Sequence, residues 1–98
     1  MFNGKNILIT GGTGSFGKKY TEILLKKYRP NKLIIFSRDE LKQYEMAQEF
    51  NEKCMRYFIG DVRDNQRLKQ ATKDVDFIIS LKRGYNYFFE EKKSIINL

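Results

Sequence analysis

The sequence predicts an α/β fold in which a parallel β-sheet carries helices on both faces. Short apolar runs alternate along the 98 residues with segments in which apolar residues recur at spacings of three and four, as they do on one face of a helix. The run at residues 33–36 is apolar throughout, which is typical of a strand covered on both faces in a parallel sheet. Strands that alternate with helices imply right-handed crossovers and therefore parallel neighbours.

Four strands and three helices are expected, in the order βαβαβαβ. The strands are residues 6–10, 33–36, 56–59 and 75–79, and the helices are residues 15–28, 40–50 and 65–73. Pro30 ends the first helix, a capping box of Ser37 and Glu40 begins the second, and Asp64 caps the third. The result is half of a Rossmann-type parallel sheet, truncated, with the strand order 3-2-1-4 and its ligand crevice at the carboxyl ends of the strands.

The first two helices each have an apolar face that is expected to pack on the sheet. In the first helix this face consists of Phe16, Tyr20, Ile23, Leu24 and Tyr28. In the second helix it consists of Leu41, Tyr44, Met46, Ala47 and Phe50.

The composition limits the classes of function. A hydrophobic content of 41% is enough for one small domain, and the net charge of +7 favours anionic partners such as phosphates, nucleic acid or acidic membranes without choosing among them. One cysteine, Cys54, and no histidine exclude disulfide frameworks, histidine-containing metal sites and histidine acid–base chemistry within this chain. With no signal-peptide pattern and no long apolar run, we expect a cytoplasmic protein that has no membrane partner.

A glycine-rich turn at residues 10–17 lies between the first strand and the first helix. Gly11 would permit a tight bend, Gly14 would leave room for a pyrophosphate, and Gly17 would let helix and strand pack closely. The backbone at Thr13, Ser15 and Phe16, at the positive end of the helix dipole, would then bind the phosphates. A purely structural turn is the alternative, but the strand before it and the amphipathic helix after it favour nucleotide binding.

The end of the second strand would lie near the ribose of a bound dinucleotide. An acidic residue there usually binds the 2′-hydroxyl of NAD, whereas an arginine beside a hydroxyl suits the 2′-phosphate of NADP. Arg38, helped by Ser37 and Lys42, could form charge-assisted hydrogen bonds to that phosphate. The sequence therefore favours NADP, while Asp39 leaves NAD open. In the alternative, this segment is only a helix cap with Arg38 as a solvated surface charge.

Two further short motifs bear on function. After the third strand, the Asp61 carboxylate is placed to accept from the adenine amine and Val62 to pack on the ring, the alternative being an aspartate in an ordinary turn. Tyr28 and Lys32 satisfy the Tyr-x-x-x-Lys spacing of dehydrogenase catalytic pairs, but Pro30 breaks the required helical turn and the pair falls at the wrong end of the sheet. We therefore assign no catalytic role to that pair.

Three segments carry a family resemblance: residues 10–17, 36–43 and 58–64, the second reading Phe-Ser-Arg-Asp-Glu-Leu-Lys-Gln. They resemble the amino-terminal part of the inverting UDP-N-acetylglucosamine 4,6-dehydratases, CapD-like polysaccharide biosynthesis proteins of the extended short-chain dehydrogenase/reductase family. The resemblance implies an NADP that takes hydride from C4 of the sugar and returns it to C6 after loss of water across C5 and C6, in flagellin-glycan or surface-polysaccharide biosynthesis. It places the adenosine phosphate end against Arg38, Asp39, Glu40, Leu41, Lys42 and Gln43, and the adenine against Asp61 and Val62.

The resemblance ends at Ile79, and it divides the chain into an NADP-binding half-domain at residues 1–79 and a divergent tail at residues 80–98. In the family, the catalytic pairs and the sugar site lie farther along the chain. We therefore assign no catalytic or metal-binding residue, and we expect a UDP-sugar to bind only if the missing half is supplied. In the tail, a helix face of Tyr85, Phe88, Phe89, Ile95 and Ile96 is expected to cover the open sheet edge, although a frameshifted or prematurely ended reading frame would also explain this segment.

Two other functional classes remain open from the sequence. A basic module could bind single-stranded nucleic acid through Lys82, Arg83, Tyr85 and Tyr87, but the positive charge is spread over all expected solvent faces, which disfavours this class. A non-functional remnant would self-associate through its open sheet edge, so a homo-oligomer is also compatible with the sequence.

Overall fold

A computed structural model of the chain describes residues 1–80 and 94–97 and shows a five-stranded sheet with three helices. The elements are β1 (Asn6–Thr10), α1 (Ser15–Lys27), β2 (Lys32–Ser37), α2 (Glu40–Glu49), β3 (Met55–Ile59), α3 (Asn65–Thr72), β4 (Phe77–Ser80) and β5 (Ser94–Asn97). The strand order is β3-β2-β1-β4-β5, and every neighbouring pair is parallel. The predicted Rossmann-type order of the first four strands is therefore confirmed, and a fifth strand extends it.

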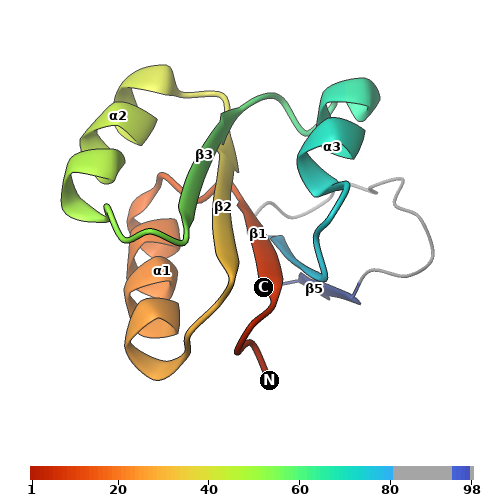
Figure 1. The fold of residues 1–98 in the computed structure, drawn as a ribbon. Helices are drawn as coiled ribbons and strands as arrows, with labels where there is room; N and C mark the ends of the chain where they lie inside the picture. The colour runs from red at the N-terminus through yellow and green to blue at the C-terminus, as the bar shows by residue number, and fades with distance from the viewer. Residues whose placement is uncertain (81–93, 98) are drawn as a thin grey trace.

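Helices cover both faces of the sheet, as predicted. Helices α1 and α2 lie on one face and α3 lies on the other (Figure 1). Alternate residues of β1 serve the two sides, because Ile7 and Ile9 pack in one core cluster with Leu24 of α1, whereas Leu8 packs in a second cluster with Leu68 of α3. Strand β1 is thus buried on both faces, which explains its unbroken apolar run.

The strand register brings three loops to one edge of the sheet. Thr10 of β1 pairs with Phe36 of β2, and Phe36 in turn pairs with Phe58 of β3. The glycine-rich turn, the end of β2 and the loop after β3 therefore start side by side at the carboxyl ends of the strands. This is the edge at which open parallel sheets bind ligands.

The predicted apolar faces of the first two helices are partly wrong. The buried stripe of α1 is formed by Gly17, Thr21 and Leu24, and that of α2 includes Gln43 and Met46. Several predicted core residues fall one or two positions away from these stripes and are exposed: Phe16, Ile23, Leu41 and Tyr44. Hydrophobic residues alone do not mark the buried face of these helices, because small and polar residues occupy part of it.

The predicted capping box at the start of α2 is also wrong. Asp39 is the N-cap, and its Oδ1 accepts from the backbone N–H of Lys42 at 3.0 Å. Ser37 still belongs to β2, where its Oγ accepts from Nε2 of Gln43 at 2.9 Å. By contrast, the Asp64 cap of α3 is confirmed, with its Oδ1 accepting from the backbone N–H of Arg67 at 3.1 Å.

The end of the chain forms a strand where a helix was predicted. Ile95 and Ile96 lie in β5, which pairs in parallel with β4, and Ile96 packs against the core cluster on the α1 side. A short β-branched run suits pairing with the otherwise open edge of β4 better than it suits a helix. The other predicted helix residues, Tyr85, Phe88 and Phe89, lie outside the described residues. Across the described residues, no helix combines the length and the apolar character needed to cross a membrane.

Candidate functional site

The glycine-rich turn is held tightly to the end of β2. Gly11 has a φ of 67°, a conformation that residues with a Cβ rarely adopt, and its N–H donates to the carbonyl oxygen of Phe36 at 3.0 Å. A Cβ on Gly17 would lie 2.3 Å from the carbonyl oxygen of Gly12, so the first turn of α1 touches the backbone of the turn directly. Gly12, which the sequence prediction did not single out, is buried against Ile35.

Gly14 differs from its neighbours because the fold itself does not require a glycine there. Its φ is −72°, which any residue adopts, and a Cβ on it would meet no described atom closer than the carbonyl oxygen of Gly11 at 4.0 Å. The space in front of Gly14 is therefore open. A ligand that approaches the backbone closely would account for a glycine at this position.

The start of α1 has the properties of an anion site. Gly14 is the N-cap and no side chain caps the helix, so the first amides have no partner within it. The first turn carries no acidic residue that would oppose the helix dipole. Ser15 and Phe16 are exposed and Thr13 is buried beneath them in the turn. An uncapped, unopposed helix start of this kind can bind a phosphate group through its backbone.

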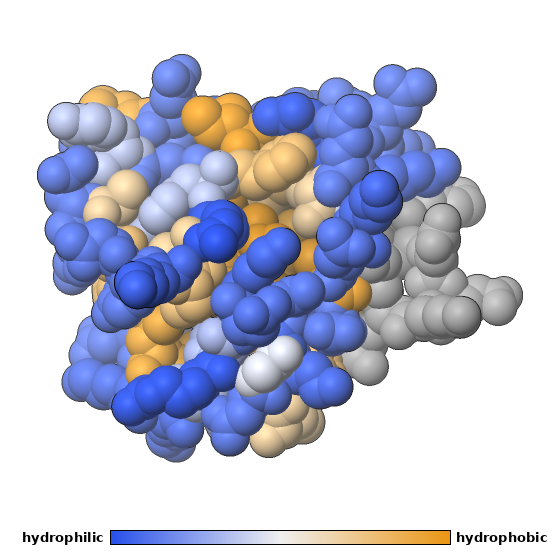
Figure 2. All heavy atoms as spheres, viewed as in Figure 1, coloured by the Kyte–Doolittle hydropathy of each residue, from blue (hydrophilic) through white to orange (hydrophobic). Residues whose placement is uncertain are grey.

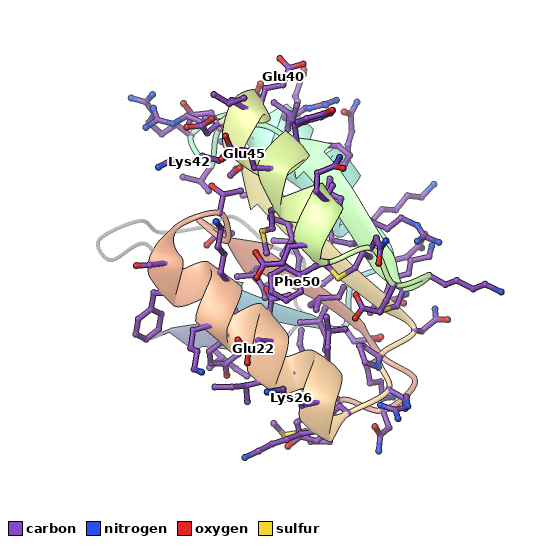
Figure 3. The ribbon with its side chains drawn as sticks, turned by 90° about the vertical axis from the view of Figure 1, so that its left-hand side faces the viewer. Glu22, Lys26, Glu40, Lys42, Glu45 and Phe50 are labelled. Carbon is purple, nitrogen blue, oxygen red and sulfur yellow. The ribbon has the colours of Figure 1, made fainter. Side chains whose placement is uncertain are left out.

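At the end of β2 the two charged residues have different tasks. The Asp39 carboxylate caps α2, as described above, whereas the Arg38 side chain is 56% exposed and its Nη1 lies 3.6 Å from Oδ2 of Asp61. Glu40, Leu41 and Lys42 are exposed on the first turn of α2; Figure 3 labels Glu40 and Lys42 at this end of the helix. The end of β2 therefore presents the exposed guanidinium of Arg38 beside the Asp39 carboxylate, one oxygen of which caps α2.

Gln43, one of the predicted cofactor residues, is used inside the fold. It is buried, and its Nε2 donates to Oγ of Ser37, to the carbonyl oxygen of Ser37 at 3.2 Å and to that of Phe58 at 3.1 Å. These bonds tie the end of β2 to β3. Gln43 and the Ser37 hydroxyl thus hold the edge of the site in shape.

A small hollow joins the three predicted segments. Its volume is about 40 Å³, and it is lined by Gly11, Phe36, Ser37, Arg38, Gly60 and Val62. The floor is closely packed, because a Cβ on Gly60 would lie 2.7 Å from Cζ of Phe36 and 2.8 Å from Cγ of Arg67. Val62 packs against the core cluster on the α3 side. The predicted adenine residues therefore adjoin the glycine-rich turn and the end of β2.

Asp61 stands between two guanidinium groups. Oδ2 accepts from Nη2 of Arg63 at 2.6 Å, Oδ1 accepts from Nε of Arg63 at 3.0 Å and from its backbone N–H at 2.9 Å, and Arg38 lies farther off. Hydrogen bonding to the Arg63 side chain and backbone, aided by the charges of Arg63 and Arg38, holds the pKa of the Asp61 carboxyl well below its usual range. The carboxylate is therefore ionised across the physiological pH range. Arg63 was missed by the sequence prediction, although the Asp-x-Arg spacing could have indicated it.

Larger hollows lie at the opposite ends of the strands. One of about 330 Å³ is lined by Asn6, Lys32, Arg56 and residues at the end of α3, and its walls include Ile34 and Phe58. Figure 2 shows hydrophobic residues between polar ones on the face that presents β3. None of the predicted site residues lines this hollow, which runs from the amino ends of β1 and β2 along β3 beside the end of α3. Its larger volume alone does not make this hollow a better candidate for a binding site than the edge at the glycine-rich turn.

The remaining sequence candidates do not form a site in the described part of the chain. The helix α1 ends at Lys27, so Tyr28 and Lys32 do not share a helical turn, and Lys32 begins β2 at the edge opposite the glycine-rich turn. Cys54 is half-buried, and burial raises the pKa of its thiol. Residues 1–80 and 94–97 contain no group of three histidine, cysteine or acidic residues arranged to hold a metal ion.

Comparison with known proteins places the chain in a family. Residues 7–82 match the family model described as polysaccharide biosynthesis protein. The chain belongs to this polysaccharide biosynthesis family. The inverting UDP-N-acetylglucosamine 4,6-dehydratase of Campylobacter jejuni is 73% identical over 79 residues, which cover 81% of this chain and 24% of the relative. The chain thus spans about a quarter of the length of these curated relatives.

Another relative aligns over more of the chain. An uncharacterized membrane protein of Methanocaldococcus jannaschii is 39% identical over 103 residues, covering 98% of this chain and 31% of that relative. This alignment includes most of residues 80–98, for which the sequence alone predicts no family resemblance.

Solved structures agree on the fold. Pen from Bacillus thuringiensis is 33% identical with a TM-score of 0.78, over 88% of this chain and 27% of that chain. A short-chain dehydrogenase/reductase from Veillonella parvula, solved in complex with NADP, is 21% identical with a TM-score of 0.65, over 80% of this chain and 35% of that chain. The family member described here therefore has the fold of the short-chain dehydrogenase/reductases.

Proposed function

We propose that this polysaccharide biosynthesis protein binds NADP at the carboxyl ends of β1, β2 and β3. The observation that carries the proposal is Gly14, where neither backbone conformation nor packing calls for a glycine and where open space faces an uncapped helix start. The pyrophosphate would bind to the backbone between Thr13 and Phe16. The adenosine would bind beside Arg38, with Asp61 and Val62 against the adenine.

NADP is proposed over NAD because of the charges at the end of β2. The residue that would bind the 2′-hydroxyl of NAD is Asp39, and one oxygen of its carboxylate is already bonded to the start of α2. Arg38 is exposed and makes only a long contact with Asp61, so its guanidinium is available to a 2′-phosphate. Lys42, exposed in the first turn of α2, adds a second positive charge.

We propose further that the chain is the cofactor-binding part of a UDP-N-acetylglucosamine 4,6-dehydratase. The 73% identity to the Campylobacter jejuni enzyme supports this activity. The nicotinamide would supply the hydride acceptor for C4 of the sugar and the hydride donor for C6 after loss of water. No residue of this chain is assigned to the proton transfers, so turnover is expected only when the rest of such an enzyme is present. A cytoplasmic location stays a prediction from the sequence.

Thermal unfolding with added dinucleotide tests the cofactor assignment. A ligand that binds only the folded state stabilises it by RT ln(1 + [L]/Kd), which is about 2.7 kcal/mol at one hundred times Kd. We expect NADP to raise the melting temperature more than NAD does at equal concentration. Arg38→Ala should abolish this difference, while the control Lys53→Ala, which removes an exposed charge at the far end of β3, should preserve it. No shift with either dinucleotide would refute the proposal.

A further inference from the structure

We infer that Arg63 is a positioning residue that determines the preference for a 2′-phosphorylated dinucleotide, by keeping Asp61 from competing with the phosphate for Arg38. The inference rests on the proposed function and deepens it. It concerns a residue that does not line the hollow and that touches the site through the carboxylate of Asp61.

The geometry of the two arginines around Asp61 is unequal. Arg63 engages both carboxylate oxygens, with Nη2 at 2.6 Å from Oδ2 and Nε at 3.0 Å from Oδ1, in a side-on arrangement. Arg38 approaches Oδ2 only to 3.6 Å, beyond hydrogen-bond distance. The carboxylate is thus paired mainly with Arg63, and the pairing is local, because Arg63 follows two residues later in the same loop.

This inequality leaves Arg38 available to a ligand. A charge-assisted bidentate pair is roughly twice as strong as an ordinary hydrogen bond, whereas a long contact between exposed charges contributes little. Arg38 can therefore turn toward an incoming phosphate without breaking a hydrogen bond to Asp61. Its exposed fraction of 56% is consistent with a side chain that is free to turn.

Removing Arg63 would make Arg38 the main partner of Asp61. Asp61, which is 28% exposed, would retain Arg38 as its nearest cation, and the two would form the closer pair that Arg63 now prevents. A 2′-phosphate would then have to break that pair and also bind beside an unneutralised carboxylate. Both effects oppose a dianionic phosphate, and neither acts on NAD, whose ribose carries a neutral hydroxyl at that position.

Arg63→Ala would also lower the affinity for NADP if Arg63, whose side chain is 63% exposed, bound the 2′-phosphate directly. The two explanations differ in how they depend on Asp61. If Arg63 acts through Asp61, neutralising that carboxylate makes Arg63 dispensable. If Arg63 contacts the phosphate itself, its removal costs affinity whether or not residue 61 is charged.

The experiment is a double-mutant cycle on the 98-residue chain, with NADP, NAD, adenosine 2′,5′-bisphosphate and 5′-AMP titrated into each variant. Arg63→Ala should lower the affinity for the two 2′-phosphorylated ligands about threefold to tenfold and change the affinity for the other two less than about twofold. In the Asp61→Asn background, Arg63→Ala should leave the ratio of NADP to NAD affinity unchanged. Lys53→Ala serves as the control for loss of one positive charge.

Three results would overturn the inference. If Arg63→Ala weakens the binding of all four ligands equally, Arg63 has a merely structural role. If Arg63→Ala leaves the ratio of NADP to NAD affinity unchanged, Arg63 has no role in cofactor specificity. A loss of NADP affinity that persists in the Asp61→Asn background would assign Arg63 to the phosphate itself. If the unmodified chain binds none of the four ligands, the proposed function fails first, and the inference falls with it.

Discussion

Replacing Gly14 and Gly17 in turn with alanine separates what the fold needs from what a ligand needs. The two glycines lie three residues apart at the start of α1, so the two variants alter the same turn. At Gly17 the new Cβ would lie 2.3, 2.4 and 2.5 Å from the oxygen, carbonyl carbon and Cα of Gly12, all of them backbone atoms. At Gly14 it would meet nothing closer than 4.0 Å.

The expected stabilities follow from these contacts. Relief at Gly17 requires the helix and the turn to separate by roughly 1 Å, and overpacking of this kind costs about 1–3 kcal/mol or more, against about 1 kcal/mol gained in helix propensity. Because backbone atoms cannot rotate away, we expect an overpacking cost near the top of this range. The net loss of stability in Gly17→Ala would then be about 2 kcal/mol, or a melting temperature lower by roughly 10 °C. At Gly14 the weaker N-cap preference of alanine and the reduced entropy of the unfolded chain nearly cancel, so stability should change by less than about 0.5 kcal/mol.

Cofactor binding should be weakened by Gly14→Ala, the variant that leaves stability almost unchanged. A methyl group at Gly14 would occupy the space in which the pyrophosphate is proposed to lie, so NADP affinity should fall at least about tenfold, equivalent to about 1.4 kcal/mol of ligand-dependent stabilisation. Melting curves of the unmodified chain and of both variants, with and without NADP, measure stability and binding together. An unchanged NADP shift in Gly14→Ala would refute the reasoning about the open space. A Gly17→Ala variant as stable as the unmodified chain would refute the reasoning about close packing.

Three further substitutions test the interior and the site electrostatics. Thr21→Val should raise stability by about 1 kcal/mol in urea unfolding, because among the described residues the buried Thr21 hydroxyl has no hydrogen-bond partner. Tyr57→Phe should cost about 1 kcal/mol at neutral pH by removing the 2.6 Å bond to the carbonyl oxygen of Phe50. Burial raises the pKa of Tyr57 to about 12, so its contribution to the free energy of unfolding is present below about pH 10 and lost as pH rises through 12. A pH series in which Tyr57→Phe loses as much stability at alkaline pH as the unmodified chain would contradict this. Because the pKa of Asp61 is lowered, its contribution to the free energy of unfolding is present above about pH 4 and is lost on further acidification. NMR titration of the Asp61 carboxyl carbon should show a higher pKa in Arg63→Ala than in the unmodified chain. An unchanged pKa would refute the pairing of Asp61 with Arg63.

The sheet could be predicted because its signals are local. Each of the first four strands is a short apolar or β-branched run with a turn or helix on either side, and the right-handed crossover rule orders them once they are identified. Asp64 was predictable as a cap for the same reason, since it directly precedes a helical segment. The fifth strand was not, because a four-residue run such as Ser94–Asn97 becomes a strand only when a distant edge, here β4, is available to pair with it.

The details of the site depend on contacts that sequence spacing does not reveal. Ser37 cannot cap α2 because β2 extends through it, and the buried amide of Gln43 pairs with it across six residues. Asp39 consequently takes the cap, and one oxygen of its carboxylate is bonded to the backbone of α2. The choice between Arg38 and Arg63 as the main partner of Asp61 is likewise a matter of side-chain geometry.

The residues at the ligand edge divide into two groups according to what explains them. Gly11, Gly17 and Gly60 are required by the chain itself, through a positive φ or through contacts that a Cβ would violate. Gly14 and Arg38 are explained by no contact within the described fold, since one faces open space and the other makes a single long ion pair. Features without an internal explanation that gather at the carboxyl ends of parallel strands are the ones a ligand would account for. The pyrophosphate proposed at Gly14 and the 2′-phosphate proposed at Arg38 would belong to one molecule, and NADP is the nicotinamide dinucleotide that carries both.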